Sequence, residues 1–196
     1  MKKIGVFGSS FNPIHIGHLI ISEQARIRLN LDKVLFIPTA NPYHKKVELL
    51  DYDIRFKMVE DTIKDNGYFE ISDIERNYNK NSYSYDIMNM LKTKEDANYY
   101  FIIGSDSFNY INEWYKYEEL LQIVNLVIFK RPGYDIDLEK LKEYKKTTKK
   151  EIIYYSDLQI EISSTYIRNS IKKGILPKYI LHDYTLEFIK ENKLWF

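Results

Sequence analysis

Short apolar runs that end in glycine, proline or polar residues alternate with helix-like stretches along most of the chain. Residues 4–7 form the first apolar run, which ends at Gly8, and residues 33–37 form the second, which stops at Pro38. Between them, residues 18–29 have the pattern of a helix. This part of the chain therefore predicts a strand, a loop, a helix and a second strand in succession.

Further strands are expected after a helix that Asp51 can cap and that runs to about residue 65. These strand candidates are residues 69–71, 99–103, 126–129 and 152–155. Helical patterns separate most of them, and strands that alternate with helices predict a parallel sheet with helices on both faces. We therefore expect an α/β fold with a doubly wound, Rossmann-like parallel sheet.

The last part of the chain has a different pattern. Residues 164–172 and 183–192 are predicted helices, and Gly174 and Pro177 separate them. We expect a Rossmann-like core over residues 1–162 and a small helical cap at the end of the sheet over residues 163–196. Neither an internal repeat nor a Gly/Ser-rich linker divides the chain, so its 196 residues are predicted to form one domain.

Composition restricts the chemistry. The chain has no cysteine, which excludes disulfides, thiolate nucleophiles and thiolate zinc sites. A formal net charge of +1 gives no global field that attracts nucleic acid. The local basic cluster of Lys145, Lys146, Lys149 and Lys150 has no aromatic residue for stacking on a base, so we expect a solvated helix end or loop.

Hydropathy favours a cytoplasmic protein without a membrane segment. No apolar run reaches about 18 residues, and the first positions become polar too soon for a signal peptide. We expect neither a membrane nor a nucleic acid as a partner. The sequence does not fix the oligomeric state, and a homo-oligomer is compatible with it.

The loop after the first predicted strand carries the most distinctive chemistry. His15 and His18 stand three residues apart at a helix start and project to the same side, with Gly17 between them to allow close approach of a backbone or a phosphate. Free amides at a helix start attract anions, so we interpret this loop as a phosphate site. Either histidine taken alone would more often be a satisfied surface or core residue, and a zinc site would need a third ligand nearby.

Residues near the start of the helix at position 164 indicate a second anion site. Ser163, Ser164 and Thr165 offer hydroxyls and free amides that face outward, and Arg168 follows one turn later on the same face. An ordinary helix cap is the alternative for these hydroxyls.

A carboxylate follows the most apolar strand. Ligands of an open α/β sheet bind beyond the carboxyl ends of its strands, which is where Gly104 and Asp106 are expected. Asp106 can accept hydrogen bonds from ribose hydroxyls there, or it can cap the next helix.

Considered as an ordered set, these motifs resemble the bacterial nicotinate mononucleotide adenylyltransferases of the HxGH nucleotidyltransferase superfamily. The two histidines alone name only the superfamily, but the resemblance extends over nearly the whole chain. The other matching motifs are PTANPYHK at residues 38–45, SYSYD at 82–86, IGSD at 103–106 with Trp114 beyond it, RPG at 131–133 and ISSTYIR at 162–168.

The resemblance implies an ATP site and an acceptor site, with the β- and γ-phosphates against the helix that starts near Ser163. The residues that it assigns to ATP are Gly8, Ser9, Phe11, His15, Gly17, His18, Gly104, Asp106, Ser163, Ser164, Thr165 and Arg168. Those that it assigns to the mononucleotide are Asn41, His44, Lys45, Ser84, Asp106, Trp114, Tyr115 and Arg131. Those that it marks as catalytic are His15, His18, Lys45 and Arg168.

Two positions depart from the family pattern. Tyr43 stands where the family commonly has a second proline, and Ser84 replaces the usual threonine but retains a hydroxyl. The resemblance also implies that Trp114 stacks on the pyridine ring, although tryptophans are more often core residues than ligand platforms.

The implied reaction transfers an adenylyl group from ATP to nicotinate mononucleotide, which gives nicotinate adenine dinucleotide and pyrophosphate in NAD biosynthesis. An acceptor phosphate with a second pKa near ~6 is already a dianion at pH 7, so direct in-line displacement needs no general base and no covalent intermediate. Mg2+ is expected to bridge ATP oxygens, held chiefly by phosphates and water and with no protein ligand assigned.

Two other functions remain open. One is a different superfamily transferase, such as a pantetheine-phosphate adenylyltransferase or a cytidylyltransferase, against which Trp114 and the loop from Asn41 to Lys45 argue. The other is a non-catalytic nucleotide-sensing module, which intact His15, His18 and Arg168 disfavour.

Overall fold

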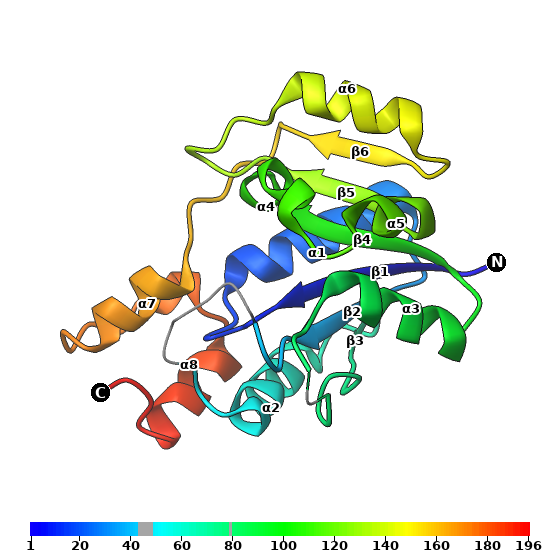
Figure 1. The fold of residues 1–196 in the computed structure, drawn as a ribbon. Coiled ribbons are helices and arrows are strands. Elements are labelled where there is room, and N and C mark those ends of the chain that lie inside the picture. The colour runs from blue at the N-terminus through cyan, green and yellow to red at the C-terminus, as the bar shows by residue number, and fades with distance from the viewer. Residues whose placement is uncertain (43–48, 79) are drawn as a thin grey trace.

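A parallel sheet of six strands, in the order β3-β2-β1-β4-β5-β6, is the frame of the molecule (Figure 1). The computed structural model describes residues 1–42, 49–78 and 80–196. The strands are β1 (Lys3–Ser9), β2 (Lys33–Pro38), β3 (Phe69–Ile71), β4 (Asn98–Gly104), β5 (Asn125–Phe129) and β6 (Ile152–Tyr155). Each neighbouring pair of strands is parallel, as the sequence pattern predicts.

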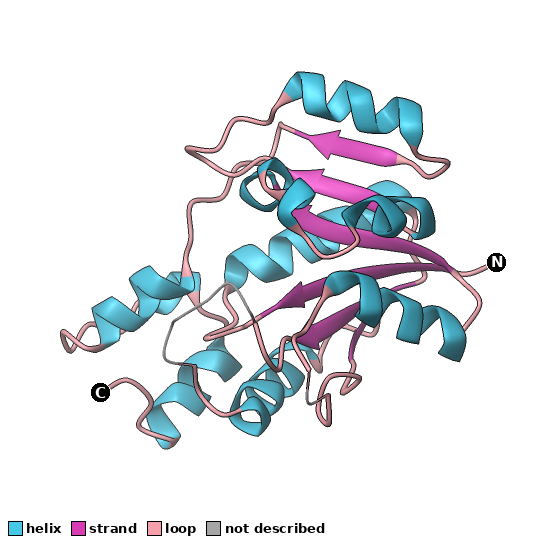
Figure 2. Cartoon of the chain, in the orientation of Figure 1, coloured by secondary structure: helices cyan, strands magenta, loops and turns pink. Residues whose placement is uncertain are grey.

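Helices cover both faces of the sheet (Figure 2). They are α1 (Ile16–Leu29), α2 (Tyr52–Ile63), α3 (Ser84–Lys94), α4 (Ser105–Asn109), α5 (Tyr117–Ile123), α6 (Leu138–Thr147), α7 (Ser164–Ile171) and α8 (Asp183–Glu191), with short 3-10 turns η1 (Ile111–Glu113) and η2 (Lys178–Ile180). The predicted α/β class with a doubly wound sheet is thereby confirmed.

Each central strand feeds two separate hydrophobic cores, because successive side chains of a strand point to opposite faces. In β4, Phe101 and Ile103 pack in the core on the face covered by α3, α5 and α6. Tyr100 and Ile102 pack in the core on the other face, with residues of α1, α2, α7 and α8. Burial on both faces explains why β4 is a nearly continuous apolar run in the sequence.

The order of the strands places the site. The chain winds outward from β1 to β2 and β3, then crosses back to β4, which pairs with β1 on its other side. After β1 the chain continues toward one edge of the sheet, and after β4 it continues toward the other edge. A crevice therefore opens beyond the carboxyl ends of these two strands. The strand ends at this crevice are Ser9 and Gly104.

The two predicted C-terminal helices are present, but α8 packs against α2 and does not merely close the end of the sheet (Figure 1). The hydroxyl of Thr62 in α2 lies 2.8 Å from that of Thr185 in α8. Ile167 in α7 and Ile189 in α8 are completely buried in the same core as α2. Helices α7 and α8 therefore share the hydrophobic core that also contains residues of α1 and α2.

Local details agree with the sequence pattern or shift it slightly. Helix α1 begins at Ile16, two residues before the predicted start, and His15 is its N-cap residue. Asp51 occupies the N-cap position of α2, but its side chain makes no capping hydrogen bond to the described residues. No helix in the described ranges is long and apolar enough to cross a membrane.

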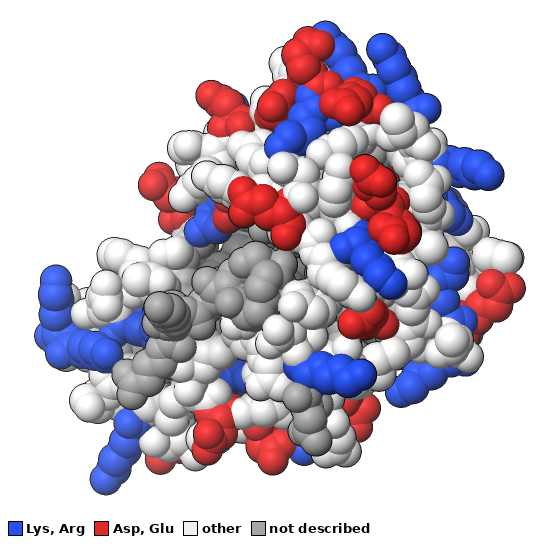
Figure 3. All heavy atoms as spheres, viewed as in Figure 1, with Lys and Arg blue, Asp and Glu red and all other residues white. Residues whose placement is uncertain are grey.

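Charged side chains are mixed on the surface. Lys145 and Lys146 are exposed in the last turn of α6, as predicted for a solvated helix end. On the face shown in Figure 3, basic and acidic side chains are interspersed and do not gather in one patch of a single sign.

Candidate active site

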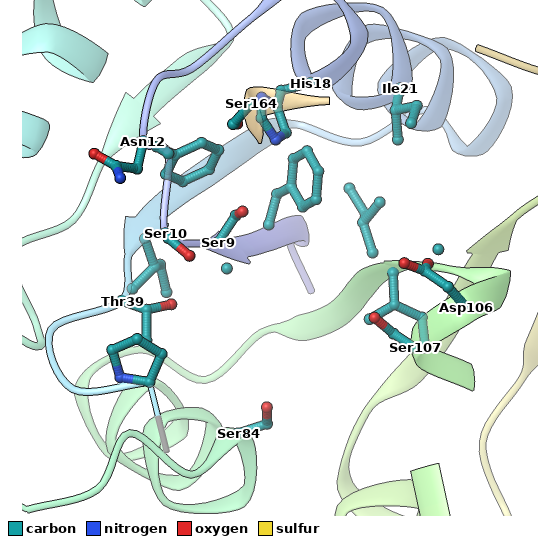
Figure 4. A pocket seen from close by; sticks show the side chains of 18 of the residues that line it. Ser9, Ser10, Asn12, His18, Ile21, Thr39, Ser84, Asp106, Ser107 and Ser164 are labelled. Atoms are coloured by element: carbon teal, nitrogen blue, oxygen red, sulfur yellow. The ribbon is translucent and has the colours of Figure 1, made fainter. Parts of the chain in front are cut away.

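A cavity of about 540 Å³ lies beyond the carboxyl ends of β1 and β4, a size typical of small-molecule sites (Figure 4). In Figure 4, His18 and Ser164 lie near each other on one side of this cavity, whereas Asp106 and Ser84 lie on other sides. Loops and helix starts that are far apart in the sequence therefore meet around one space.

Every residue assigned to ATP by the resemblance lines this cavity. These residues are Gly8, Ser9, Phe11, His15, Gly17, His18, Gly104, Asp106, Ser163, Ser164, Thr165 and Arg168. Among those assigned to the mononucleotide, Ser84, Trp114, Tyr115 and Arg131 line it as well. Residues predicted for the ATP site and residues predicted for the mononucleotide site thus line one continuous cavity.

The segment of residues 10–18, which we call the histidine loop, joins β1 to the first turn of α1 and contains two stacked imidazoles. The ring centroids of His15 and His18 lie 3.6 Å apart with an interplanar angle of 23°. The backbone amide of His15 donates to Nδ1 of His18 at 3.1 Å. A Cβ atom on Gly17 would lie only 3.1 Å from Nδ1 of His15 and 3.4 Å from a methyl of Ile160. The glycine therefore makes room for the His15 ring, a reason more local than the phosphate approach that the sequence suggested.

His15 is an uncharged group at neutral pH. Only 6% of its surface is exposed, and burial, assisted by the positive charge of Arg131, lowers its pKa to about 3. Its Nδ1 atom is buried without a hydrogen-bond partner among the described residues. A neutral imidazole offers one donor or one acceptor at each nitrogen and carries no charge, so any cationic stabilisation of an anion must come from other residues.

Hydroxyls at the start of α7 are engaged within the protein. Ser163 is the N-cap residue, and its Oγ accepts from the backbone amide of Tyr166 at 3.2 Å. Ser164 donates through Oγ to the carbonyl of Pro13 at 2.8 Å. Of these hydroxyls, one therefore caps the helix, which was the alternative, and another holds the helix to the histidine loop, while all three residues border the cavity.

Arg168 also joins α7 to the histidine loop. One guanidinium nitrogen donates to the carbonyl of Asn12 at 2.8 Å, and another donates to Oγ1 of Thr165 at 3.3 Å. A guanidinium has five N–H donors, so two bonds leave donor capacity for an anion in the cavity. The predicted face that joins Arg168 to the helix start is present.

A carboxylate and a guanidinium pair on the β4 side of the cavity. Nη1 of Arg131 lies 2.5 Å from Oδ2 of Asp106. A Cβ atom on Gly104 would clash with Oδ1 of Asp106, so the glycine is required for the carboxylate to fold back over the strand end. Gly104 is the N-cap residue of α4 and Asp106 lies in the first turn of that helix, so Asp106 does not occupy the N-cap position.

Aromatic side chains form another wall. Trp114 is half-buried, packs edge-to-face on Phe101 with centroids 6.2 Å apart, and also borders the cavity. Tyr115 is 43% exposed, and its ring lies 4.6 Å from that of Tyr83. Ser84 is the first residue of α3 beside them. Trp114 is thus both a core residue and a wall of the site, so the two interpretations of the sequence do not exclude each other.

One described residue predicted for the mononucleotide, Asn41, does not border the cavity. The side-chain amide of Asn41 donates to the carbonyls of Tyr78 and Lys80, at 2.9 and 3.3 Å, and Asn41 is not among the residues that border the cavity. His44 and Lys45 lie outside the described residues. The structure therefore directs Asn41 to the backbone of a neighbouring loop.

Sequence reasoning missed Glu75. This carboxyl is 4% exposed, borders the cavity, and accepts at Oε2 from the amide of Ala40 at 2.8 Å and from the hydroxyl of Ser82 at 2.5 Å. Burial raises its pKa. Glu75 lies in the loop after β3, so a search of the loops after every strand end would have included it.

Cavity position, helix starts and the histidine pair together define a nucleotidyltransferase of the cytidylyltransferase-like class, and residues 6–170 match the family model described as "Cytidylyltransferase-like". A Clostridium novyi protein named "Probable nicotinate-nucleotide adenylyltransferase" is 43% identical over the full length of both chains. The chain therefore belongs to the cytidylyltransferase-like family and, within it, to the nicotinate-nucleotide adenylyltransferases.

More distant proteins agree. A Lactiplantibacillus plantarum protein of the same name is 36% identical over 99% of this chain and 88% of the relative. The solved structure of "Plasmodium falciparum nicotinic acid mononucleotide adenylyltransferase complexed with NaAD" is similar with a TM-score of 0.81 at 22% identity, over 100% of this chain and 98% of the other. At that identity the similarity establishes the fold.

The buried His15 predicts a specific loss of stability in acid. Its pKa is about 3 in the folded protein, against an ordinary value of 6.5, so between these values the unfolded chain binds more protons and stability falls as the pH falls. At about pH 5 this group should cost about 2 kcal/mol relative to pH 7.5. Urea unfolding of the parent and of His15→Gln at both pH values measures the difference. The same pH dependence in both proteins would contradict the assignment.

Proposed function

We propose that the protein transfers the adenylyl group of ATP to the phosphate of nicotinate mononucleotide and releases pyrophosphate. The observation that carries this proposal is the single cavity in which two helix starts, the stacked histidines and an aromatic wall face one another. ATP and the mononucleotide are the partners that such a site needs, and the cytoplasm is where we expect them to meet.

The ATP half has the electrostatics of a polyphosphate site. Neither α1 nor α7 has an acidic residue in its first turn, so nothing in either turn offsets the positive potential of the free amides. His18 stands in the first turn of α1, and Arg168 supplies the permanent positive charge on α7. We assign the α-phosphate to the neighbourhood of His18 and the outer phosphates to Arg168.

The acceptor half combines an aromatic surface with donors. Trp114 and Tyr115 offer ring faces and edges to a pyridine ring, and the start of α3 at Ser84 offers backbone amides to its carboxylate. Asp106, which pairs with Arg131 in this structure, can exchange that partner for ribose hydroxyls.

Catalysis in this site would come from orientation and charge. An oxygen of the acceptor phosphate forms a bond to the α-phosphorus while the bond to the bridging oxygen of the pyrophosphate breaks, and the leaving group takes the electron pair. His18 and Arg168 would stabilise the charge that moves onto the pyrophosphate. No step requires a proton acceptor, because the acceptor phosphate is already a dianion near pH 7.

Mg2+ would be carried mainly by the substrate. Among the described residues there is no group of three or more His, Cys, Asp or Glu side chains that could hold a metal ion. We propose an ion bound through ATP phosphate oxygens and water, which is how Mg2+ commonly binds at nucleotide sites. Its charge would offset that of the triphosphate.

The acceptor preference tests the function directly. Nicotinate mononucleotide carries one more negative charge than the amide form, so amides near Ser84 and Tyr115 should favour it by about tenfold or more in kcat/KM, or about 1.4 kcal/mol. Pyrophosphate release with each acceptor measures the ratio, and 4′-phosphopantetheine serves as the control acceptor. Equal values for acid and amide would refute this acceptor while leaving the reaction class intact.

His18 and Arg168 should differ in what they contribute. His18→Ala should lower kcat by about 10²–10³ with only a small change in ATP affinity, because a donor aimed at developing charge acts mainly in the transition state. Arg168→Ala should also weaken ATP binding, because a cation acts on the outer phosphates in the ground state. Steady-state kinetics and calorimetric titration of both variants decide this. Turnover of His18→Ala within about threefold of the parent would remove the histidine loop from the mechanism.

Trp114 should contribute stacking to the acceptor alone. Trp114→Ala should raise the Michaelis constant for the mononucleotide by the equivalent of about 1–3 kcal/mol of binding free energy, and it should leave the Michaelis constant for ATP nearly unchanged. Circular dichroism of the variant is the control. Loss of folding would assign Trp114 to the core through its contact with Phe101.

A further inference from the structure

Arg55 in α2 is a completely buried arginine that is held by backbone carbonyls. It is 1% exposed, and it forms no ion pair with a carboxylate in the described part of the chain. Nε donates to the carbonyl of Leu50 at 2.8 Å, and Nη1 donates to the carbonyls of Ser10 and Thr39 at 2.8 and 3.0 Å. Burial lowers its pKa, but a guanidinium remains charged under all ordinary conditions.

The three carbonyls belong to the segments that form the two halves of the site. Ser10 is in the histidine loop, and both Ser10 and Thr39 border the cavity. Thr39 and Leu50 lie on either side of the segment that contains His44 and Lys45, the residues assigned to the mononucleotide by resemblance. We call the residues between Thr39 and Leu50 the acceptor segment. One planar group therefore joins the histidine loop to both ends of the acceptor segment.

Neighbouring hydrogen bonds hold the same backbone from other directions. Glu75 accepts from the amide of Ala40, and Oδ1 of Asn12 accepts from the amide of Leu50 at 3.3 Å. The carbonyl of Asn12 in turn accepts from Arg168. The Arg55 clamp is therefore continuous, through Leu50 and Asn12, with the guanidinium that we assign to the outer phosphates.

Stability alone is a poor reason for this arrangement. A buried charge costs free energy unless its hydrogen bonds are satisfied, and a buried ionic group can often be replaced by apolar side chains of similar volume without loss of stability. The guanidinium supplies a fixed distance between three backbone positions in two loops, which an apolar side chain does not, since its planar donors are rigid.

We propose that Arg55 is a positioning residue for the transfer reaction. It touches neither substrate, but it holds the histidine loop and the ends of the acceptor segment at the separation that in-line attack requires. Misplacement of a reacting group by about 1 Å can reduce the rate by about 10²-fold. Two of the three carbonyls flank the acceptor segment, so loss of the clamp should affect the mononucleotide more than ATP.

Arg55→Lys tests the clamp, because an ammonium keeps the charge but lacks the rigid fork. We expect kcat/KM for the mononucleotide to fall by about 10²-fold with a raised KM, while the KM for ATP stays within about threefold. The matched control is Thr62→Val on the same helix, which removes buried hydrogen bonds to Met58 and Thr185 and touches neither loop. It should lower the melting temperature without changing the kinetics.

Amide hydrogen exchange without substrates supplies a readout that does not need turnover. The amides of Ala40 and Leu50 should exchange faster in Arg55→Lys than in the parent, and Thr62→Val should leave them unchanged. The proposal rests on the proposed function, which the parent's own turnover tests separately. Unchanged exchange at both amides, or an equal rise of both Michaelis constants, would overturn the positioning role.

A second variant keeps the test decisive if Arg55→Lys does not fold. Arg55→Met has a similar length and no charge, and it should show the same selective loss toward the mononucleotide. Parental kinetics in folded Arg55→Met, or failure of both variants to fold, would assign Arg55 a purely structural role and overturn the proposal.

Discussion

The parallel pairing of β1 with β4 is the constraint on which the site depends. The register sets Lys3 opposite Asn98 and Val6 opposite Phe101, so the loops after both strands leave the sheet at the same edge. Because the chain winds in opposite directions from these strands, a crevice opens beyond their carboxyl ends. The starts of α1 and α7 border this crevice, and the free backbone amides of a helix start make it suitable for an anion.

Loops at such a crevice must be held without blocking it, and here side chains that bind backbone carbonyls do this. Ser164 and Arg168 bind the histidine loop from α7, while Arg55 binds it from α2 and reaches the segment after β2. These bonds satisfy carbonyls that irregular backbone would otherwise leave unpaired in a buried place. The same groups therefore stabilise the fold and set the geometry of the site.

Electrostatic roles in the site are divided between neutral and charged groups. Burial keeps His15 neutral, and the nearby charge of Arg131 adds to that effect. Because the His15 imidazole is neutral, it can stack on His18 and hold the loop in shape without the cost of burying a positive charge. Permanent positive charge comes instead from Arg168 and the helix starts, which act on phosphate oxygens at a distance and without titration near pH 7.

Much of the site follows from the sequence alone because its ATP half is built from short continuous segments. Spacing within one helix turn is local, so the side-by-side placement of His15 and His18 could be predicted, and alternation of apolar runs with helices was sufficient for the fold class. Contacts between distant segments are not encoded in any local period. Tertiary structure alone decided the burial of Arg55, the hydrogen bonds of Asn41 to the carbonyls of Tyr78 and Lys80, the bond of Ser164 to the histidine loop and the packing of α8 on α2. These features have the same physical reason. Each one pairs polar or apolar groups of distant segments, and those segments come together only when the sheet assembles.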